Sequence, residues 1–84
     1  MSGMLEIDVR FFGAFRKYGQ NILLNIPYGC SALSMKESLL SALGGKDAEL
    51  IGDAALADNE GILPHDHIFV KGGHVSILPP VCGG

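Results

Sequence analysis

The sequence predicts an α+β protein in which one main helix packs across a mixed β-sheet. Three observations lead to this fold class: alternating apolar and polar residues over 4–12, leucines at helical spacing over 34–43, and a second alternating segment over 75–78. The chain has 84 residues, 48% of them hydrophobic, which is enough for one core. We therefore expect one domain over residues 1–78 and a flexible tail over residues 79–84.

Two strands open the chain. The segment 4–12 is apolar at its odd positions and largely polar between them, which is the period of a half-buried strand. The segment 21–26 repeats the alternation, and Pro27 ends it because proline has no N–H for a ladder. Residues 13–19 are predicted to be a turn. The inward side chains of this hairpin are expected to be Leu5, Ile7, Val9, Phe11, Ile22, Leu24 and Ile26.

A helix should follow. Ser34 and Glu37 have the spacing of a capping box, in which each side chain satisfies a free backbone N–H at a helix start. Gly44 and Gly45 supply the left-handed stop that a helix end favours. The apolar stripe of this helix, expected to pack into the core, is Met35, Leu39, Leu40 and Leu43.

The remaining elements are short. Residues 46–53 have a weak pattern that predicts a brief helical turn, and residues 59–61 predict a turn between two short strands, the first over 55–58. Gly72 and Gly73 precede the last strand. In that strand Val75 and Ile77 are expected to point inward, and Pro79 and Pro80 to end it.

Charge and hydropathy exclude two classes of function. A formal net charge of −3 gives no basic surface of the kind that binds nucleic acid. No apolar run approaches the roughly 18 residues of a membrane span, and residues 1–8 lack the pattern of a signal peptide. The expected location is therefore cytoplasmic, with no membrane partner.

Cysteines and histidines do not form a metal motif. Cys30 and Cys82 are expected to be free thiols, because a reducing compartment disfavours a disulfide that would also pin the tail. His65, His67 and His74 are expected to be surface residues that flank a turn, and no Cys-x-x-Cys pair is present. We expect no bound metal.

The last six residues carry the functional signal. Pro79 and Pro80 hold the start of the tail extended, and the final glycines, Gly83 and Gly84, leave the terminal carbonyl unobstructed. A carboxylate becomes an acyl donor only after activation with a leaving group such as adenylate, which implies a partner that uses ATP. Glycine content alone, 12 of 84 residues, could produce such an end; its coupling to a strand and a Pro-Pro stop favours a carrier.

Two segments resemble a known family. The end of the chain, residues 75–84, is similar to the end of the small subunit of molybdopterin synthase, a sulfur carrier of the ubiquitin-like β-grasp superfamily. Residues 9–16 resemble the first strand of that family and the turn after it, residues 59–73 match more loosely, and the middle helix matches only by position. The resemblance implies a β-grasp fold with adjacent first and last strands.

The resemblance also implies a chemistry. An E1-like adenylating enzyme would activate Gly84, and a persulfide sulfur donor would convert it to a thiocarboxylate. The thiocarboxylate would then donate its sulfur to a pterin precursor bound in the molybdopterin synthase large subunit. The chain would then be no enzyme by itself but part of a sulfurtransferase complex, with no permanently bound cofactor. Gly83, which has no side chain, would let the end of the chain pass into a narrow active site of the partner. The contacts with the partner would come from Phe12, Leu78, Pro79, Pro80, Val81 and Cys82.

Some positions depart from the family pattern. Cys82 stands where the family usually has a small or hydroxyl residue, and its thiol is expected to be an apolar filler, with persulfide or thioester chemistry as the alternative. Gly73 and His74 stand where acidic residues are frequent, which changes the charge available to a partner. Arg16 matches a basic family position that could meet an acidic activating enzyme, and otherwise is simply solvated.

Other functions fit the same pattern of residues. A carrier for thiamine or another sulfur metabolite also ends in Gly-Gly, and so does a ubiquitin-like modifier that is joined to lysines of other proteins. A self-contained enzyme fits least, because the sequence shows no nucleophile and base set, no paired carboxylates and no phosphate-binding glycine motif. Chain length and the Pro-Pro pair favour the molybdopterin synthase subunit.

Overall fold

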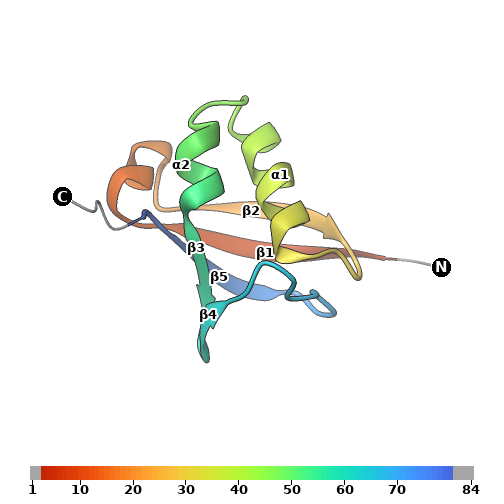
Figure 1. Cartoon of the computed structure of the whole chain (residues 1–84). Helices are drawn as coiled ribbons and strands as arrows, with labels where there is room; N and C mark the ends of the chain where they lie inside the picture. Colours follow the sequence, from red (N-terminus) through yellow and green to blue (C-terminus); the bar gives the residue numbers. More distant parts are fainter. Residues whose placement is uncertain (1–2, 81–84) are drawn as a thin grey trace.

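The structure, a computed structural model, describes residues 3–80. A mixed sheet forms one layer, and the helices lie together on one of its faces (Figure 1). This is the predicted α+β architecture. In chain order the elements are β1 (Met4–Phe11), the 3-10 helix η1 (Gly13–Tyr18), β2 (Asn21–Pro27), α1 (Ala32–Ala42), α2 (Ala48–Asp53), β3 (Ala55–Asp58), β4 (Gly61–Leu63) and β5 (Gly73–Leu78).

The strand order is β2-β1-β5-β3-β4. β1 and β5 are parallel neighbours at the centre, whereas β1 with β2, β3 with β5 and β3 with β4 are antiparallel. The predicted adjacency of the first and last strands is therefore confirmed. Because β1 and β5 run in the same direction, their carboxyl ends meet at the same edge of the sheet.

The core lies between the sheet and the helices. The period-two pattern is confirmed: Ile7, Val9 and Phe11 of β1 are buried, while the residues between them face away from the helices. Burial of these apolar side chains stabilises the fold at roughly 25 cal/mol per Å² of apolar surface removed from water. The other buried apolar residues are Phe15, Leu24, Ile26, Ala32, Met35, Leu39, Ile51, Ala54, Leu56, Phe69, Val75 and Ile77.

The start of α1 differs from the prediction. Its N-cap is Ser31, whose hydroxyl accepts from the Ser34 N–H at 3.1 Å, and the helix begins at Ala32. Ser34 therefore occupies the third helical position, so the predicted Ser34–Glu37 capping box was wrong by one turn. The same N-cap chemistry operates at Ser31 because its extended backbone (φ −83°, ψ 165°) aims the hydroxyl at that N–H.

Other boundaries shift by smaller amounts. Residues 13–19, expected as a turn, contain η1 and its C-cap Gly19, because burial of Phe15 favours a compact helical turn over an open loop. β1 ends at Phe11, one residue early, since Phe12 is the N-cap of η1. The brief helical turn expected within residues 46–53 is α2, and Gly44 and Gly45 end α1 with φ of 81° and 79° as expected.

Within residues 3–80, no helix is both long enough and apolar enough to cross a bilayer.

Candidate functional site

The candidate site is the edge of the sheet at which β1 and β5 end side by side. Phe11 and Ile77 are register partners, and both are buried. Successive side chains of a strand alternate between faces, so the next residues, Phe12 and Leu78, fall on the face away from the helices. Phe12 has extended backbone (φ −133°, ψ 156°) and is 38% exposed, and Leu78 is half-buried. An apolar pair therefore borders the point where β5 passes into Pro79.

Gly13 fixes the path of the chain beyond β5. Its φ of 58° lies in the left-handed region, and a Cβ added to it would come within 2.6 Å of Pro79 Cγ. Only a glycine allows both the backbone conformation and the close approach. Pro79 consequently packs on the first residue of η1, and the chain leaves the sheet along a defined direction.

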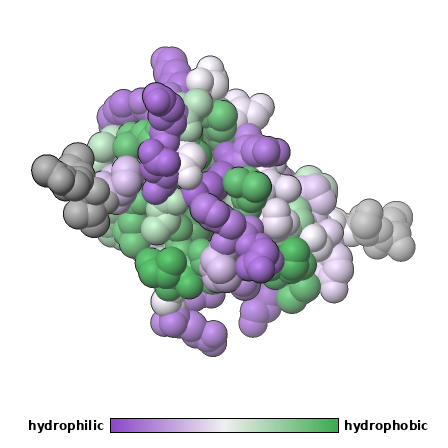
Figure 2. Space-filling model, viewed as in Figure 1, coloured by the Kyte–Doolittle hydropathy of each residue, from purple (hydrophilic) through white to green (hydrophobic). Residues whose placement is uncertain are grey.

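The surface at this end is apolar. Figure 2 shows green patches toward the left-hand end, where β5 ends in Figure 1, and purple, polar side chains that extend from the top across the middle of the view. Several large hydrophobic residues are exposed elsewhere, so the apolar surface is divided into patches. These residues, besides Phe12, are Met4, Leu23, Tyr28, Leu33, Ile62, Ile68 and Val70.

The helix η1 is held from two sides. Phe15 is completely buried, and the ring of Tyr18 lies 5.9 Å from that of Phe11. Tyr18 donates its hydroxyl hydrogen to the Asp47 carboxylate, and Lys17 Nζ lies 2.8 Å from Asp47 Oδ2. The hydrogen bonds from Lys17 and Tyr18 lower the pKa of Asp47, and the Asp47 partner raises the pKa of Lys17. The edge that carries Gly13 is therefore anchored to the segment before α2.

A polar cluster lies farther back on the same outward face. Asp8 of β1 accepts from Asn21 Nδ2 at 2.6 Å, and its second oxygen is 3.1 Å from His74 Nδ1 and 3.7 Å from Arg10 Nε. The Asn21 hydrogen bond, with smaller contributions from His74 and Arg10, lowers the pKa of Asp8. A partner that covers this face meets a carboxylate that is already satisfied by neighbours within the sheet.

The structure brings together only part of the predicted partner-contact set. Phe12, Leu78 and Pro79 lie at one edge, and Pro80 is half-buried beside them in sequence. Val81, Cys82, Gly83 and Gly84 lie outside the described residues, so for them the expected flexibility of the tail stays a prediction. Arg16 is exposed on η1, which is compatible both with a solvated arginine and with contact to an acidic activating enzyme.

Sequence reasoning missed Lys36. It is only 3% exposed, and its amine donates to the carbonyl oxygens of Ala54 at 2.5 Å and Gly52 at 3.1 Å. Burial lowers its pKa. The amine thus satisfies the carbonyls at the end of α2 and links α1 to the residue before β3, the strand that pairs with the end of β5. A signal existed: Lys36 follows Met35 on the buried face of the predicted helix.

No part of the described chain is built to hold a metal. Within residues 3–80, no group of three or more His, Cys, Asp and Glu side chains is placed around a common point. His65 and His74 are exposed and His67 is half-buried, close to the expected arrangement around a turn. Cys30 is a half-buried free thiol whose pKa burial raises, which disfavours the reactive thiolate.

Comparison with solved structures defines the fold. The chain is similar to the HVO 2177 protein of Haloferax volcanii, with 26% identity and a TM-score of 0.76 over 98% of this chain and 89% of that one. It is also similar to a Pyrococcus furiosus protein described as molybdopterin converting factor, subunit 1 (20% identity, TM-score 0.70, 92% and 99% covered). Caldiarchaeum subterraneum ubiquitin superposes with a TM-score of 0.66 at 12% identity, over 98% and 100% of the two chains.

Sequence comparison adds nothing to this. No family model matches the chain, and no curated protein matches it in sequence. The structural matches nevertheless extend over 92% to 98% of this chain, at TM-scores of 0.66 to 0.76. The chain has the ubiquitin-like β-grasp fold, which these solved structures share.

Proposed function

We propose that this protein is a sulfur carrier whose C-terminal Gly84 is adenylated and converted to a thiocarboxylate. It acts as the small subunit of a molybdopterin synthase in molybdenum cofactor biosynthesis. In this reaction the carboxylate displaces pyrophosphate from ATP on an E1-like enzyme. A persulfide sulfur then displaces AMP, and a second thiol cleaves the resulting acyl disulfide to leave the thiocarboxylate. The catalytic groups belong to the partners, and the carrier supplies the acyl group and the surface that presents it.

One observation carries the proposal. Pro79 follows the carboxyl end of a central strand and lies against Gly13, the residue after Phe12. Six residues of extended chain, 79–84, span at most about 20 Å, which suffices to enter a neighbouring active site. An apolar surface at the origin of a long, narrow segment is what a partner needs to hold the domain while it works on the far end.

The β-grasp fold supports the proposal but is shared by ubiquitin and other carriers. Carriers for other sulfur metabolites and protein modifiers use the same first step, adenylation of the terminal glycine. They differ in the acceptor of the activated acyl group or sulfur. The test must therefore measure activation and acceptor separately.

The activation test uses the full chain with ATP, an E1-like enzyme and a persulfide donor. Intact-mass spectrometry should show replacement of one oxygen by sulfur. Deletion of Gly84, or extension by one alanine, should abolish the mass change while circular dichroism stays unchanged, because these residues follow the last strand. Cys82→Ser should keep most of the change. Loss of the change in Cys82→Ser, with Gly84 intact, would assign the sulfur chemistry to the cysteine instead.

The acceptor test follows from the apolar edge. With a molybdopterin synthase large subunit, the thiocarboxylated protein should convert a pterin precursor, and Phe12→Ser should reduce this conversion. The matched control is Leu33→Ser, which removes another exposed apolar side chain, 51% exposed on α1. Transfer of the chain to protein lysines, with no sulfur delivered to the pterin, would show that the protein is a modifier.

A further inference from the structure

The opposite end of β5 has a different environment. β3 pairs with β5 from Ala55 opposite Leu78 to Ala57 opposite Ser76, and after Asp58 the chain turns away into β4. Gly73, His74 and Val75 are paired with β1 alone. Within residues 3–80, the side of β5 that β3 would occupy is therefore open over these three residues.

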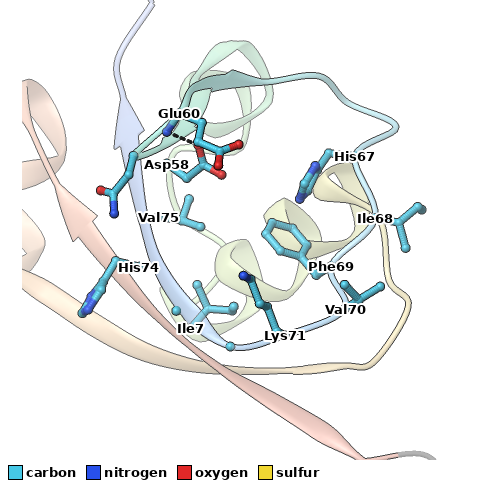
Figure 3. A pocket seen from close by; sticks show the side chains of 13 residues that line it. Ile7, Asp58, Glu60, His67, Ile68, Phe69, Val70, Lys71, His74 and Val75 are labelled. Atoms are coloured by element: carbon cyan, nitrogen blue, oxygen red, sulfur yellow. Dashed lines mark hydrogen bonds between the residues drawn. The ribbon is translucent and has the colours of Figure 1, made fainter.

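A groove of about 390 Å³ lies along this open side (Figure 3). One wall is the turn between β3 and β4, and the other is the segment 67–72 that leads into β5. Its apolar floor contains Ile7, Val75 and Phe69, all of them nearly buried. The groove therefore combines an unpaired strand edge with apolar surface.

Charged side chains of both signs surround this floor. Asp58 and Glu60 lie together on one wall, and the Lys71 side chain extends toward the middle of the groove from below (Figure 3). Among the described residues, the Asp58 carboxylate accepts one hydrogen bond, from the Glu60 N–H at 2.8 Å. Within residues 3–80, none of these three charges has an ion-pair partner; the pairs there involve Asp8 and Asp47. The charges are thus available to a ligand.

The far wall is fixed in place by the rest of the fold. Gly29 N–H donates to Phe69 O at 2.8 Å, and Phe69 N–H donates to Cys30 O at 2.9 Å. Gly72 approaches β1 so closely that an added Cβ would lie 2.7 Å from Glu6 O. A groove that is already formed requires little ordering on binding, and this favours affinity.

We propose that this groove binds an extended peptide segment of a partner protein, which adds as a short strand along Gly73–Val75. A lysine or arginine of that segment lies against Asp58 and Glu60. Backbone hydrogen bonds to an open strand edge provide affinity, and side-chain contacts in the adjoining groove provide selectivity. The two carboxylates on one wall attract a basic residue placed against them, and Lys71, which extends toward the middle of the groove, disfavours a second basic residue there.

This site is separate from the carrier chemistry. The groove lies at the amino end of β5, and the tail leaves from the carboxyl end, so one partner can hold the domain without covering the reactive segment. Failure of the peptide test would leave the sulfur-carrier proposal untouched, and failure of the mass-change test would leave this one untouched.

The test is an NMR titration of the full chain with the peptide acetyl-Thr-Val-Lys-Val-Thr-amide. We expect saturable amide shift changes that centre on Gly73, His74 and Val75. Two analogues of this peptide carry N-methyl groups on alternate amides, one on the first set of alternate amides and the other on the second. The analogue that keeps the N–H groups facing β5 should bind like the parent peptide. The other analogue, which lacks those N–H groups, should bind at least about tenfold more weakly. Equal binding of both analogues, or shifts confined to other surfaces, would overturn strand addition.

The charge requirement is tested with the double variant Asp58→Asn, Glu60→Gln. Asparagine keeps an oxygen that can accept the Glu60-position N–H, so the turn should persist. The variant should bind the lysine peptide roughly threefold to tenfold more weakly than the wild-type protein does. A peptide with glutamate in place of lysine should bind the variant more tightly than it binds the wild-type protein. The matched control is Glu37→Gln, Glu49→Gln, which removes two exposed carboxylates from the helices. The same loss in both double variants would overturn the assignment of the basic residue.

Discussion

The two ends of β5 show how one strand serves different purposes. At the carboxyl end, Ser76 and Ile77 are paired with β1 on one side and with β3 on the other. At the amino end, Gly73 and His74 are paired with β1 only, and the other side is a groove. The difference arises because β3 has four residues and turns back at Asp58, before it could cover the whole of β5.

Pairing on both sides fixes where the chain leaves the domain. The last residues of β5 cannot shift without breaking hydrogen bonds to two strands, and Pro79 is packed against Gly13. Pairing on one side instead leaves backbone groups free for another molecule. The first arrangement suits presentation of a reactive segment, and the second suits recognition. Each prediction below alters one end and asks whether the other responds.

The largest effect is expected at Phe15. Phe15→Ala should lower the free energy of unfolding by about 3–5 kcal/mol, because the ring is fully buried beneath η1. Denaturant titration measures this loss. Amide hydrogen exchange should show that Ile77 and Leu78 lose more protection than His74, since η1 supports the carboxyl end. Phe12→Ala is the control, with an expected loss within about 1 kcal/mol because Phe12 is partly exposed.

A smaller effect is expected at Lys36. Lys36→Met keeps the apolar stem but removes the amine, which leaves the carbonyls of Ala54 and Gly52 without their donor. The loss should be about 1–3 kcal/mol by denaturant titration, the range for buried polar groups left unsatisfied. Exchange should increase in β3 before it does in β2. Lys46→Met removes an exposed lysine, and a loss as large as that of Lys36→Met would contradict the role assigned to the buried amine.

The two close-approach glycines compare the ends directly. Gly13→Ala should cost about 1–2 kcal/mol for the left-handed backbone alone, and Pro79 must also move. NMR shifts should change at Leu78 and leave Gly73 unaffected. Gly72→Ala should change the NMR shifts at Gly73 and leave Leu78 unaffected, because its Cβ would meet Glu6 O, a backbone atom that cannot rotate away. Shifts that spread over the whole of β5 in either variant would show that the two ends are not independent.

Much of the fold could be predicted from local sequence patterns. The alternation of Ile7, Val9 and Phe11, and of Val75 and Ile77, identified two strands and their inward faces. Adjacency of these strands came instead from the resemblance to β-grasp carriers, since alternation says nothing of which strands pair. Exposure of Phe12 was visible because an aromatic residue interrupts the polar side of its strand.

The rest depended on contacts between segments distant in sequence. Ser31 and Ser34 are equally suited to cap a helix, and the position of Ser31 beside Ile68 decides between them. Lys36 is buried only because the end of α2 folds over it. The groove exists because β3 ends at Asp58 while β5 continues past it, a difference in length that appears only once their register is known.

The smallest effect concerns pH and the anchor of η1. The folded-state pKa of Asp47 is lowered by its hydrogen bonds to Lys17 and Tyr18, so its carboxylate stabilises the fold fully above the ordinary pKa of about 4. This stabilisation is lost as pH falls through that value toward the lowered folded pKa. Asp8 contributes in the same direction from the outward face of the sheet.

Asp47→Asn should therefore reduce the loss of stability between about pH 5 and pH 3, without removing it, because Asp8 remains. Asparagine tolerates the left-handed backbone at this position (φ 59°), so the change tests charge and not strain. Denaturant titrations at several pH values measure the slope. Asp66→Asn is the control, since within residues 3–80 Asp66 belongs to none of the ion pairs. An unchanged slope in Asp47→Asn would mean that the Lys17 and Tyr18 contacts do not persist in solution, and that η1 is held by Phe15 alone.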